Sequence, residues 1–210
     1  MFQKFVNIYN YVFSVGLKEK KLYQQHIHDG ANIFDVGSNV GSYINAISSL
    51  ADNIILNIHA FEANEDLSIL NPRILKSNLH NVKLNNIAIS SKVGTETIYI
   101  NSISSQSSME KKSKKLGKIV KEIKIDSTTL DFYCNENNID CIDLLKIDVE
   151  GMEIEVLKSA KQLLSEGKIK IIKIEISTKN FYEALDYLNN YGFLFLGITN
   201  QTYIDNKIES

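Results

Sequence analysis

Short apolar runs alternate along the chain with stretches whose apolar residues recur at helical spacing. The runs that predict buried strands are residues 33–36, 54–62, 82–90, 142–149, 169–176 and 192–199. Helices are expected after Gly41 and over residues 65–80, 127–137, 154–167 and 181–190. Strands that alternate with helices form parallel sheets, so this order predicts an α/β fold with a doubly wound, mostly parallel sheet.

The N-terminal stretch predicts helices. A helical face over residues 2–15 carries Phe2, Phe5, Val6, Tyr9, Val12 and Phe13. A second helix is expected over residues 18–27. We therefore expect residues 1–29 to form an N-terminal helical segment and residues 30–210 to form the main domain. A dimer contact and a membrane-surface helix are the alternatives for the first helix.

Two further strands are predicted over residues 95–100 and 119–125, where isoleucines alternate with polar residues. Residues 101–118 between them are rich in Ser and Lys and lack an apolar face, which predicts a mobile loop. Its basic run comprises Lys111, Lys112, Lys114, Lys115 and Lys118. A final antiparallel strand is expected over residues 202–208.

Composition excludes several classes of protein. The chain has 210 residues, 44% of them hydrophobic and 23% charged, as in one soluble globular domain. A net charge of -2 gives no reason to expect a nucleic-acid partner. Cys134 and Cys141 form no C-x-x-C motif, so we expect reduced thiols, no disulfide framework and a cytoplasmic protein. No apolar run is long enough for a transmembrane segment, and no secretory signal is present.

A Gly-rich turn follows the strand over residues 33–36 and contains Gly37, Ser38, Asn39 and Gly41. Glycines let the backbone turn sharply and let a ligand approach closely. Dinucleotide-binding proteins carry G-x-G-x-x-G, whereas this turn reads G-x-x-x-G with Asp35 before it. An acidic residue here suits the ammonium of S-adenosylmethionine better than a pyrophosphate. A nicotinamide oxidoreductase is the alternative enzyme class.

Polar residues stand at the ends of the predicted strands, namely Asp35, Glu62, Asn86, Asp148 and Glu175. In open α/β sheets ligands bind beyond the carboxyl ends of the strands. Glu62 ends the second strand, where an acidic residue accepts hydrogen bonds from ribose hydroxyls. Its alternative role is to cap the following helix.

Five segments, in order, resemble the FkbM family of S-adenosylmethionine-dependent methyltransferases: residues 34–41, 60–64, 86–90, 126–131 and 145–153. The Lys-Ile-Asp-Val-Glu-Gly-x-Glu segment that begins at Lys146 is the most specific of them. The resemblance covers about residues 30–198. The family usually has Ala where Ser38 stands and Pro where Ala63 stands, and both departures affect only loop geometry.

The resemblance implies a seven-stranded Rossmann-like sheet, the class I methyltransferase fold. It also implies methyl transfer from S-adenosyl-L-methionine to a hydroxyl of a carbohydrate, such as a nucleotide sugar or a surface-polysaccharide unit. The alternatives are another small-metabolite acceptor and a non-catalytic relative that binds the cofactor. A small molecule or glycan is the expected partner, and a homodimer is left open.

On this basis the cofactor-binding residues are expected to be Asp35, Gly37, Asn39, Gly41, Glu62, Asn64, Asn86, Ile87 and Ala88. The catalytic candidates are Asp148, Glu150 and Glu175, because an alcohol needs a group that takes up its proton. Asp148 could instead support the turn at Gly37, and Glu150 could cap the next helix. The three carboxylates could also bind a divalent metal, but no metal is assigned.

Other polar residues of these segments are expected to be structural. Lys146 is expected to be an ion-pair partner at a strand end, and Glu153 a structural residue. His59 is expected to be a satisfied histidine of the core. The basic run between residues 111 and 118 would be either a solvated loop or a lid over a phosphate-bearing acceptor.

Overall fold

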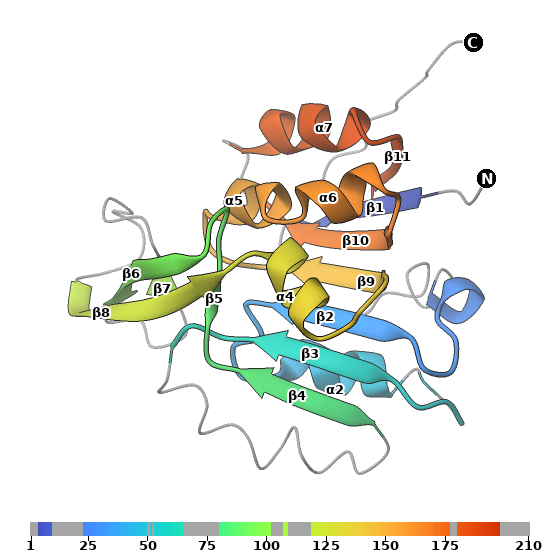
Figure 1. Cartoon of the computed structure of the whole chain (residues 1–210), viewed down its shortest axis with the longest axis horizontal. Coiled ribbons are helices and arrows are strands. Elements are labelled where there is room, and N and C mark those ends of the chain that lie inside the picture. The colour runs from blue at the N-terminus through green and yellow to red at the C-terminus, as the bar shows by residue number, and fades with distance from the viewer. Residues whose placement is uncertain are drawn as a thin grey trace.

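The computed structural model describes residues 4–9, 23–49, 51, 53–64, 80–101, 107–108, 119–176 and 180–197. Its central sheet has the strand order β11-β1-β10-β9-β2-β3-β4, and every neighbouring pair is parallel (Figure 1). The strands are β1 (Lys4–Tyr9), β2 (Asn32–Val36), β3 (Asn57–Phe61), β4 (Asn81–Asn85), β9 (Ile142–Ile147), β10 (Ile169–Glu175) and β11 (Phe193–Gly197). The expected α/β fold with a mostly parallel central sheet is confirmed.

The middle of the sheet is buried on both faces. All six residues of β9 are buried, and residues 33–36 of β2 are buried as well. Such runs are typical of parallel strands covered on both sides. Phe34 packs in one apolar cluster and Ile33 in another, because successive side chains of a strand point to opposite faces.

The predicted helix over residues 2–15 is wrong for residues 4–9, which form β1. This strand lies between β10 and β11 and pairs with both, with Phe5 opposite Ile171 and Leu194. A short apolar run is ambiguous between helix and strand, and here pairing on both sides decides it. These residues therefore belong to the central sheet. The antiparallel strand expected over residues 202–208 lies outside the described residues. The seven described strands of the central sheet include β1, which the sequence did not predict.

The helices with described bounds are α2 (Ser42–Ser48), α4 (Leu130–Glu136), α5 (Glu153–Lys158), α6 (Lys161–Ser165) and α7 (Phe181–Asn189), and they cover the sheet. The larger apolar cluster contains residues of α4, α5, α6 and α7, whereas α2 packs in the cluster on the other face. No helix in the described part of the chain is long and apolar enough to cross a membrane. Of the expected helix over 18–27, residues 23–27 are described and residues 23–26 are helical, whereas the helix expected over 65–80 lies almost wholly outside the described residues.

The single helix expected over residues 154–167 is divided into α5 and α6. The side chain of Ser159 donates to the Val156 carbonyl at 2.6 Å, and its own carbonyl accepts from Asp131 N at 3.0 Å. The Asp131 carboxylate then accepts from the backbone N–H groups of Gln162 and Leu163, at 2.8 and 3.0 Å. An acidic residue from α4 thus satisfies the donors that begin α6. This tertiary contact cannot be read from local periodicity.

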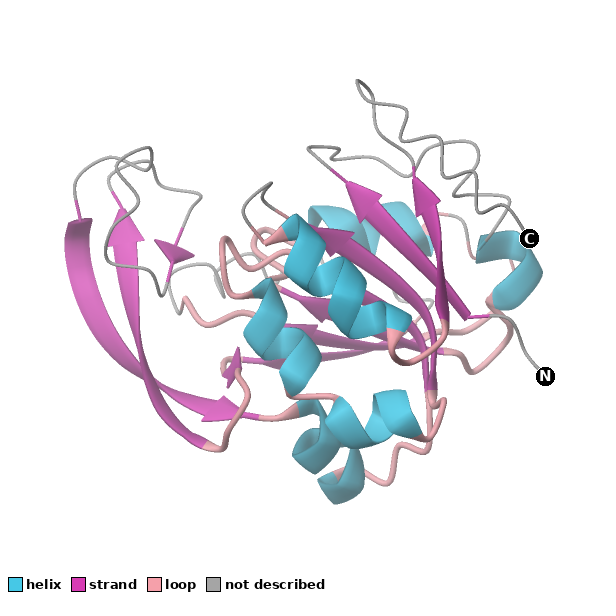
Figure 2. Ribbon diagram, turned by 90° about the horizontal axis from the view of Figure 1, so that it is seen from above, coloured by secondary structure: helices cyan, strands magenta, loops and turns pink. Residues whose placement is uncertain are grey.

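A second sheet has the order β5-β8-β6-β7. Its strands are β5 (Ala88–Ile89), β6 (Gly94–Asn101), β7 (Ser107–Ser108) and β8 (Ile119–Thr128). The predicted strands over 95–100 and 119–125 are confirmed as β6 and β8. These two strands form a long hairpin that projects away from the central sheet (Figures 1 and 2).

Two expectations for this region need correction. The strand predicted over residues 82–90 is divided between the two sheets, because the chain turns at Asn86 and Ile87 between β4 and β5. Within the loop expected over 101–118, residues 107–108 pair with β6 as β7. The lysines at 111–118 lie outside the described residues.

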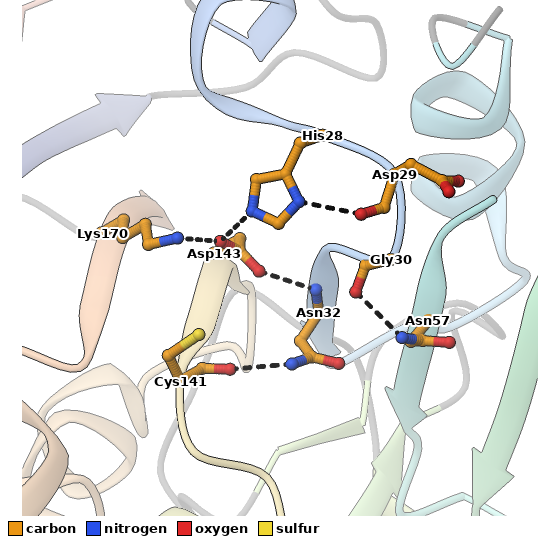
Figure 3. Close-up of polar contacts among 8 residues, drawn as sticks. All are labelled: His28, Asp29, Gly30, Asn32, Asn57, Cys141, Asp143 and Lys170. Atoms are coloured by element: carbon orange, nitrogen blue, oxygen red, sulfur yellow. Dashed lines mark hydrogen bonds and ion pairs between the residues drawn. The ribbon is translucent and has the colours of Figure 1, made fainter. Parts of the chain in front are cut away.

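At the amino ends of the strands, a buried aspartate ties β9 to the start of β2 (Figure 3). Asp143 accepts a hydrogen bond from Asn32 N at 2.8 Å and from Lys170 Nζ, and His28 Nε2 lies 3.3 Å from it. The Asn32 side chain also donates to the Cys141 carbonyl at 3.0 Å. These contacts fix the register of β2 and β9, and so they fix where both strands end.

Candidate active site

The Gly-rich turn joins β2 to α2 through three left-handed residues. The φ angles of Gly37, Asn39 and Gly41 are 77°, 45° and 73°. Gly37 N and Ser38 N both donate to the Phe61 carbonyl at 3.0 Å, which fastens the turn to the end of β3. A Cβ atom on Gly37 would stand 1.9 Å from the Asp148 carbonyl oxygen. Glycine is therefore required here both by φ and by contact with the loop after β9.

Glu62, directly after β3, organises the same turn. Its two carboxylate oxygens accept hydrogen bonds from Asn39 N and Asn64 N, each at 2.8 Å. Burial raises the pKa of this carboxyl, while the two N–H donors oppose that rise. The structure thus brings Glu62, Asn39 and Asn64 together, as three of the expected cofactor residues. The residues of a following helix that Glu62 could cap lie outside the described part of the chain.

The segment that connects β4 to β5 lies beside Glu62. The Asn86 side chain donates to the Glu62 carbonyl at 2.8 Å and to the Ala63 carbonyl at 3.3 Å. Ile87 packs against the larger apolar cluster, and Ala88 packs with residues of the hairpin. Asn86 is exposed at this edge, whereas Ala88 is buried beneath it.

Lys146 lies under the turn as an ion-pair partner, as expected from the sequence. Its Nζ atom is 3.0 Å from Asp35 Oδ1, 3.3 Å from Asp148 Oδ2 and 2.8 Å from the Gly37 carbonyl oxygen. Asp35 is fully buried, and burial raises the pKa of its carboxyl. The two carboxylates hold the pKa of Lys146 above its ordinary value despite its own burial, so the ammonium stays charged.

Three carboxylates interact at the ends of β9 and β10. Burial raises the pKa of Glu175 to about 7, and the negative charges of Asp148 and Glu150 add to this rise. Burial and the charge of Asp148 raise the pKa of Glu150 as well. The three expected catalytic residues thus lie close enough to influence one another electrostatically, and one titrates near neutral pH.

The backbone between Asp148 and α5 is left-handed, with φ of 48° at Glu150 and 109° at Gly151. Glu153 Oε1 accepts from Gly151 N at 2.7 Å, and Asn180 Nδ2 lies 3.3 Å from both Glu153 Oε2 and the Gly151 carbonyl. Glu153 therefore has the structural role expected of it. The N-cap residue of α5 is Met152, so Glu150 does not cap this helix. No sequence signal singled out Asn180.

His59 is a satisfied histidine, as predicted. Tyr133 donates to Asn85 Oδ1 at 3.2 Å, so its hydroxyl oxygen accepts from His59 Nδ1 at 2.9 Å. Burial lowers the pKa of this imidazole to about 4, which keeps it neutral. Cys134 and Cys141 are both free thiols. Among the described residues, no three His, Cys, Asp or Glu side chains are grouped to hold a metal ion.

Comparison with known proteins gives the family. Residues 35–195 match the family model described as the Methyltransferase FkbM domain. The chain belongs to the FkbM methyltransferase family. The matched range contains every residue of the Gly-rich turn from Asp35 on, Glu62, and the three carboxylates near Lys146.

A curated methyltransferase and a solved structure are similar to the chain. The 2-O-methyltransferase NoeI of Sinorhizobium fredii (strain NBRC 101917 / NGR234) is 34% identical over 62 residues, which cover 30% of this chain and 25% of NoeI. The crystal structure of Methyltransferase FkbM from Methylobacillus flagellatus KT superposes with a TM-score of 0.54 at 13% identity. That match covers 83% of this chain and 44% of the other. The chain thus spans less than half the length of each relative, and the second match supports the fold alone.

Proposed function

We propose that this chain is an S-adenosylmethionine-dependent O-methyltransferase whose acceptor is a hydroxyl of a carbohydrate, such as a nucleotide sugar or a surface-polysaccharide unit. Membership of the FkbM family supports methyl transfer, and the similarity to the 2-O-methyltransferase NoeI favours a hydroxyl acceptor. The observation that carries the proposal is that Lys146 contacts both the Gly37 carbonyl of the Gly-rich turn and the carboxylate of Asp148, which follows β9.

The residues around the turn fit the methyl donor. One Glu62 oxygen accepts a hydrogen bond from Asn39 N in the turn and the other accepts one from Asn64 N, and each has capacity for a second, which ribose hydroxyls would use. Asp35 Oδ2 is buried and accepts no hydrogen bond within the described part of the chain. An unsatisfied buried carboxylate oxygen beside the turn suits the ammonium of the donor, directly or through a water. Asn86, Ile87 and Ala88 would border the adenine.

The carboxylates fit the acceptor. S-adenosylmethionine, when bound, supplies an electrophilic methyl group on a sulfonium. An alcohol is a weak nucleophile at neutral pH, so a carboxylate must take up its proton as the oxygen attacks. Glu175, with its pKa near 7, can hold that proton, while Asp148 and Glu150 would orient the hydroxyl. The chain's main contribution is then to align the hydroxyl with the methyl group.

Two binding titrations and one transfer assay test the proposal. The chain should bind S-adenosylhomocysteine and not NADH, measured by calorimetry. Labelled S-adenosylmethionine should then label a member of a panel of nucleotide sugars and glycans. Asp148→Asn and Glu175→Gln should abolish transfer and retain S-adenosylhomocysteine binding, whereas the exposed Glu166→Gln should change neither. Binding of NADH without binding of S-adenosylhomocysteine would contradict the assignment, and cofactor binding without transfer would indicate a non-catalytic relative.

The basic run at residues 111–118 stays a prediction of the sequence. Replacing Lys111, Lys112, Lys114 and Lys115 by Ser should raise the KM for a phosphate-bearing acceptor and flatten its salt dependence. An unchanged KM would show that the run is only a solvated loop. A cytoplasmic location and a homodimer also stay predictions.

A further inference from the structure

We propose that Lys146 is a positioning residue that holds the methyl-donor turn and the acceptor-side carboxylate Asp148 in one fixed arrangement. This inference rests on the proposed function, because it assigns donor and acceptor to the two sides of the lysine. The sequence identifies Lys146 only as an ion-pair partner. Its three contacts in the structure give it a more specific task.

Sheet register brings the three contacts together. Asp35 on β2 lies directly opposite Lys146 on β9, and Asp148, two residues further along, lies on the same face. A lysine ammonium has three N–H donors, and here three acceptors surround it: Asp35 Oδ1, Asp148 Oδ2 and the Gly37 carbonyl. The Gly37 carbonyl belongs to the turn, and Asp35 belongs to the strand before it. Asp148 lies on the side where the methyl-accepting substrate is proposed to bind.

Burial makes the contacts of Lys146 costly to break. The Lys146 side chain is 9% exposed, and that of Asp35 is 0% exposed. A buried charge that loses its partner carries a large desolvation cost, so the ammonium cannot simply turn to water when one contact opens. Movement of the turn away from Asp148 would therefore break contacts that solvent does not replace.

The backbone reinforces the same junction. Asp148 N donates to the Val36 carbonyl at 3.0 Å, immediately before the turn. The Gly37 Cα faces the Asp148 carbonyl so closely that no Cβ fits between them. Backbone contacts thus set the distance between turn and loop, and Lys146 sets the direction of the Asp148 carboxylate relative to that turn. In-line transfer is sensitive to this alignment.

Lys173 provides a matched control. It is the register neighbour of Lys146 on β10, points to the same face and is also buried. Its Nζ atom lies over the Tyr43 ring, 4.8 Å from the ring centroid. The two lysines share charge, size and burial, and they differ in the contact with Gly37 and Asp148 that the proposal invokes.

The experiment compares Lys146→Met, Lys146→Arg and Lys173→Met in the full chain. Folding is checked by circular dichroism and thermal unfolding, and S-adenosylhomocysteine affinity by calorimetry. Transfer is measured at saturating methyl donor, so that kcat and the acceptor KM separate. For Lys146→Met we expect affinity to fall about 10–100-fold, as for loss of hydrogen bonds to a charged group. We expect kcat to fall at least as much while the acceptor KM changes little. Lys173→Met should retain affinity within about threefold, and kcat as well above the pH range in which Glu175 titrates, because the charge of Lys173 also lowers the pKa of Glu175.

The outcomes separate this inference from the proposed function. If the wild type binds no S-adenosylhomocysteine, the proposed function fails. If the wild type binds it and a folded Lys146→Met binds and transfers equally well, the positioning role is refuted while the function stands. Should Lys146→Met not fold, Lys146→Arg decides, because it keeps the charge but its planar guanidinium cannot reproduce three tetrahedral contacts. Wild-type kcat in that variant, or equal losses in Lys173→Met, would overturn the proposal.

Discussion

The two ends of the central sheet each hold a buried aspartate paired with a lysine, in opposite arrangements. At the amino end the anion is buried and its basic partners face water: the Asp143 side chain is 2% exposed, against 41% for Lys170 and 60% for His28. At the carboxyl end Lys146 is buried with Asp35, and the partly exposed group is Asp148, at 33%.

The difference separates a structural contact from a candidate site. Asp143 accepts hydrogen bonds from Asn32 N and Lys170 Nζ that join β2, β9 and β10, and its basic partners Lys170 and His28 remain exposed. At the other end the exposed groups are carboxylates, and Glu175 has a pKa of about 7. A group of side chains with excess negative charge and a buried cation is costly in isolation, and it is suited to a cationic donor and a proton-bearing acceptor.

The largest expected effect comes from replacing a glycine by alanine at the carboxyl end of the sheet, compared with the same replacement at the amino end. Gly37→Ala should destabilise the fold by more than about 3 kcal/mol and abolish S-adenosylhomocysteine binding, because Cβ would strike the Asp148 carbonyl in addition to the cost of positive φ. Gly30→Ala, at the amino end, has a φ of 78° and open space around Cβ, so it should cost only about 1 kcal/mol. Chemical denaturation and calorimetry measure both. Equal losses in the two variants would mean that φ alone matters.

The next comparison replaces the buried aspartate at each end of the sheet, Asp143 or Asp35, by asparagine. Asp143→Asn should lower the free energy of unfolding by about 1–3 kcal/mol and leave S-adenosylhomocysteine affinity unchanged, because its contacts lie at the amino end. Asp35→Asn should also destabilise the fold, and in addition weaken that affinity. Denaturant titration and calorimetry distinguish the two results. Weakened affinity in Asp143→Asn would show that the ends are coupled.

A smaller effect is expected at Glu62. Glu62→Ala removes the carboxylate that accepts hydrogen bonds from Asn39 N and Asn64 N, together with the proposed ribose contact. The binding free energy of S-adenosylhomocysteine should therefore weaken by about 1.5–3 kcal/mol. Glu96→Ala is the control, since Glu96 is also half-buried and accepts from Ser90 at 2.9 Å in the hairpin sheet. Calorimetry on both variants checks the result. Unaltered affinity in Glu62→Ala would leave Glu62 no role in binding.

The smallest effect concerns the pH dependence of Glu175. Its carboxyl pKa rises from 4.5 to about 7 on folding, so the folded chain binds its proton more tightly and loses stability as pH rises across that interval. Glu175→Gln should therefore unfold less readily than wild type above about pH 7, by about 1 kcal/mol after allowance for solvent screening, and the gain should vanish near pH 4. Thermal unfolding over this pH range measures it. In the wild type the transfer rate should fall below about pH 7 as Glu175 becomes protonated, and a rate that stays level across this range would move the base to Asp148 or Glu150.

The sequence was sufficient to predict the structure where the local hydrophobic pattern and the side-chain chemistry indicate the same element. The strand over 33–36, the turn at Gly37 and the helix after it follow from a buried run, glycines and helical spacing. The polar residues at the strand ends could be predicted to lie near one another, because parallel strands end at one edge of the sheet. The pairing of Lys146 with nearby carboxylates was also foreseen.

What could not be predicted depends on distant partners. The run at residues 4–9 is a strand because β10 and β11 pair with it, and nothing local requires that. The division at Ser159 depends on Asp131 from another helix. Asn180 contributes to the turn at Gly151 through a contact that spacing along the chain does not suggest.

The position of β1 has a consequence for the order of folding. Residue 5 pairs with residues 171 and 194, so the first described strand cannot dock until the last two exist. Contacts of such sequence separation carry a large loop-closure entropy and form late. The β6–β8 hairpin, by contrast, pairs residues 94–101 with 119–127 and can form from its own segment. During synthesis the amino-terminal strand would therefore wait, unpaired, for nearly the whole chain, and the slot between β10 and β11 would be among the last parts of the molecule to close.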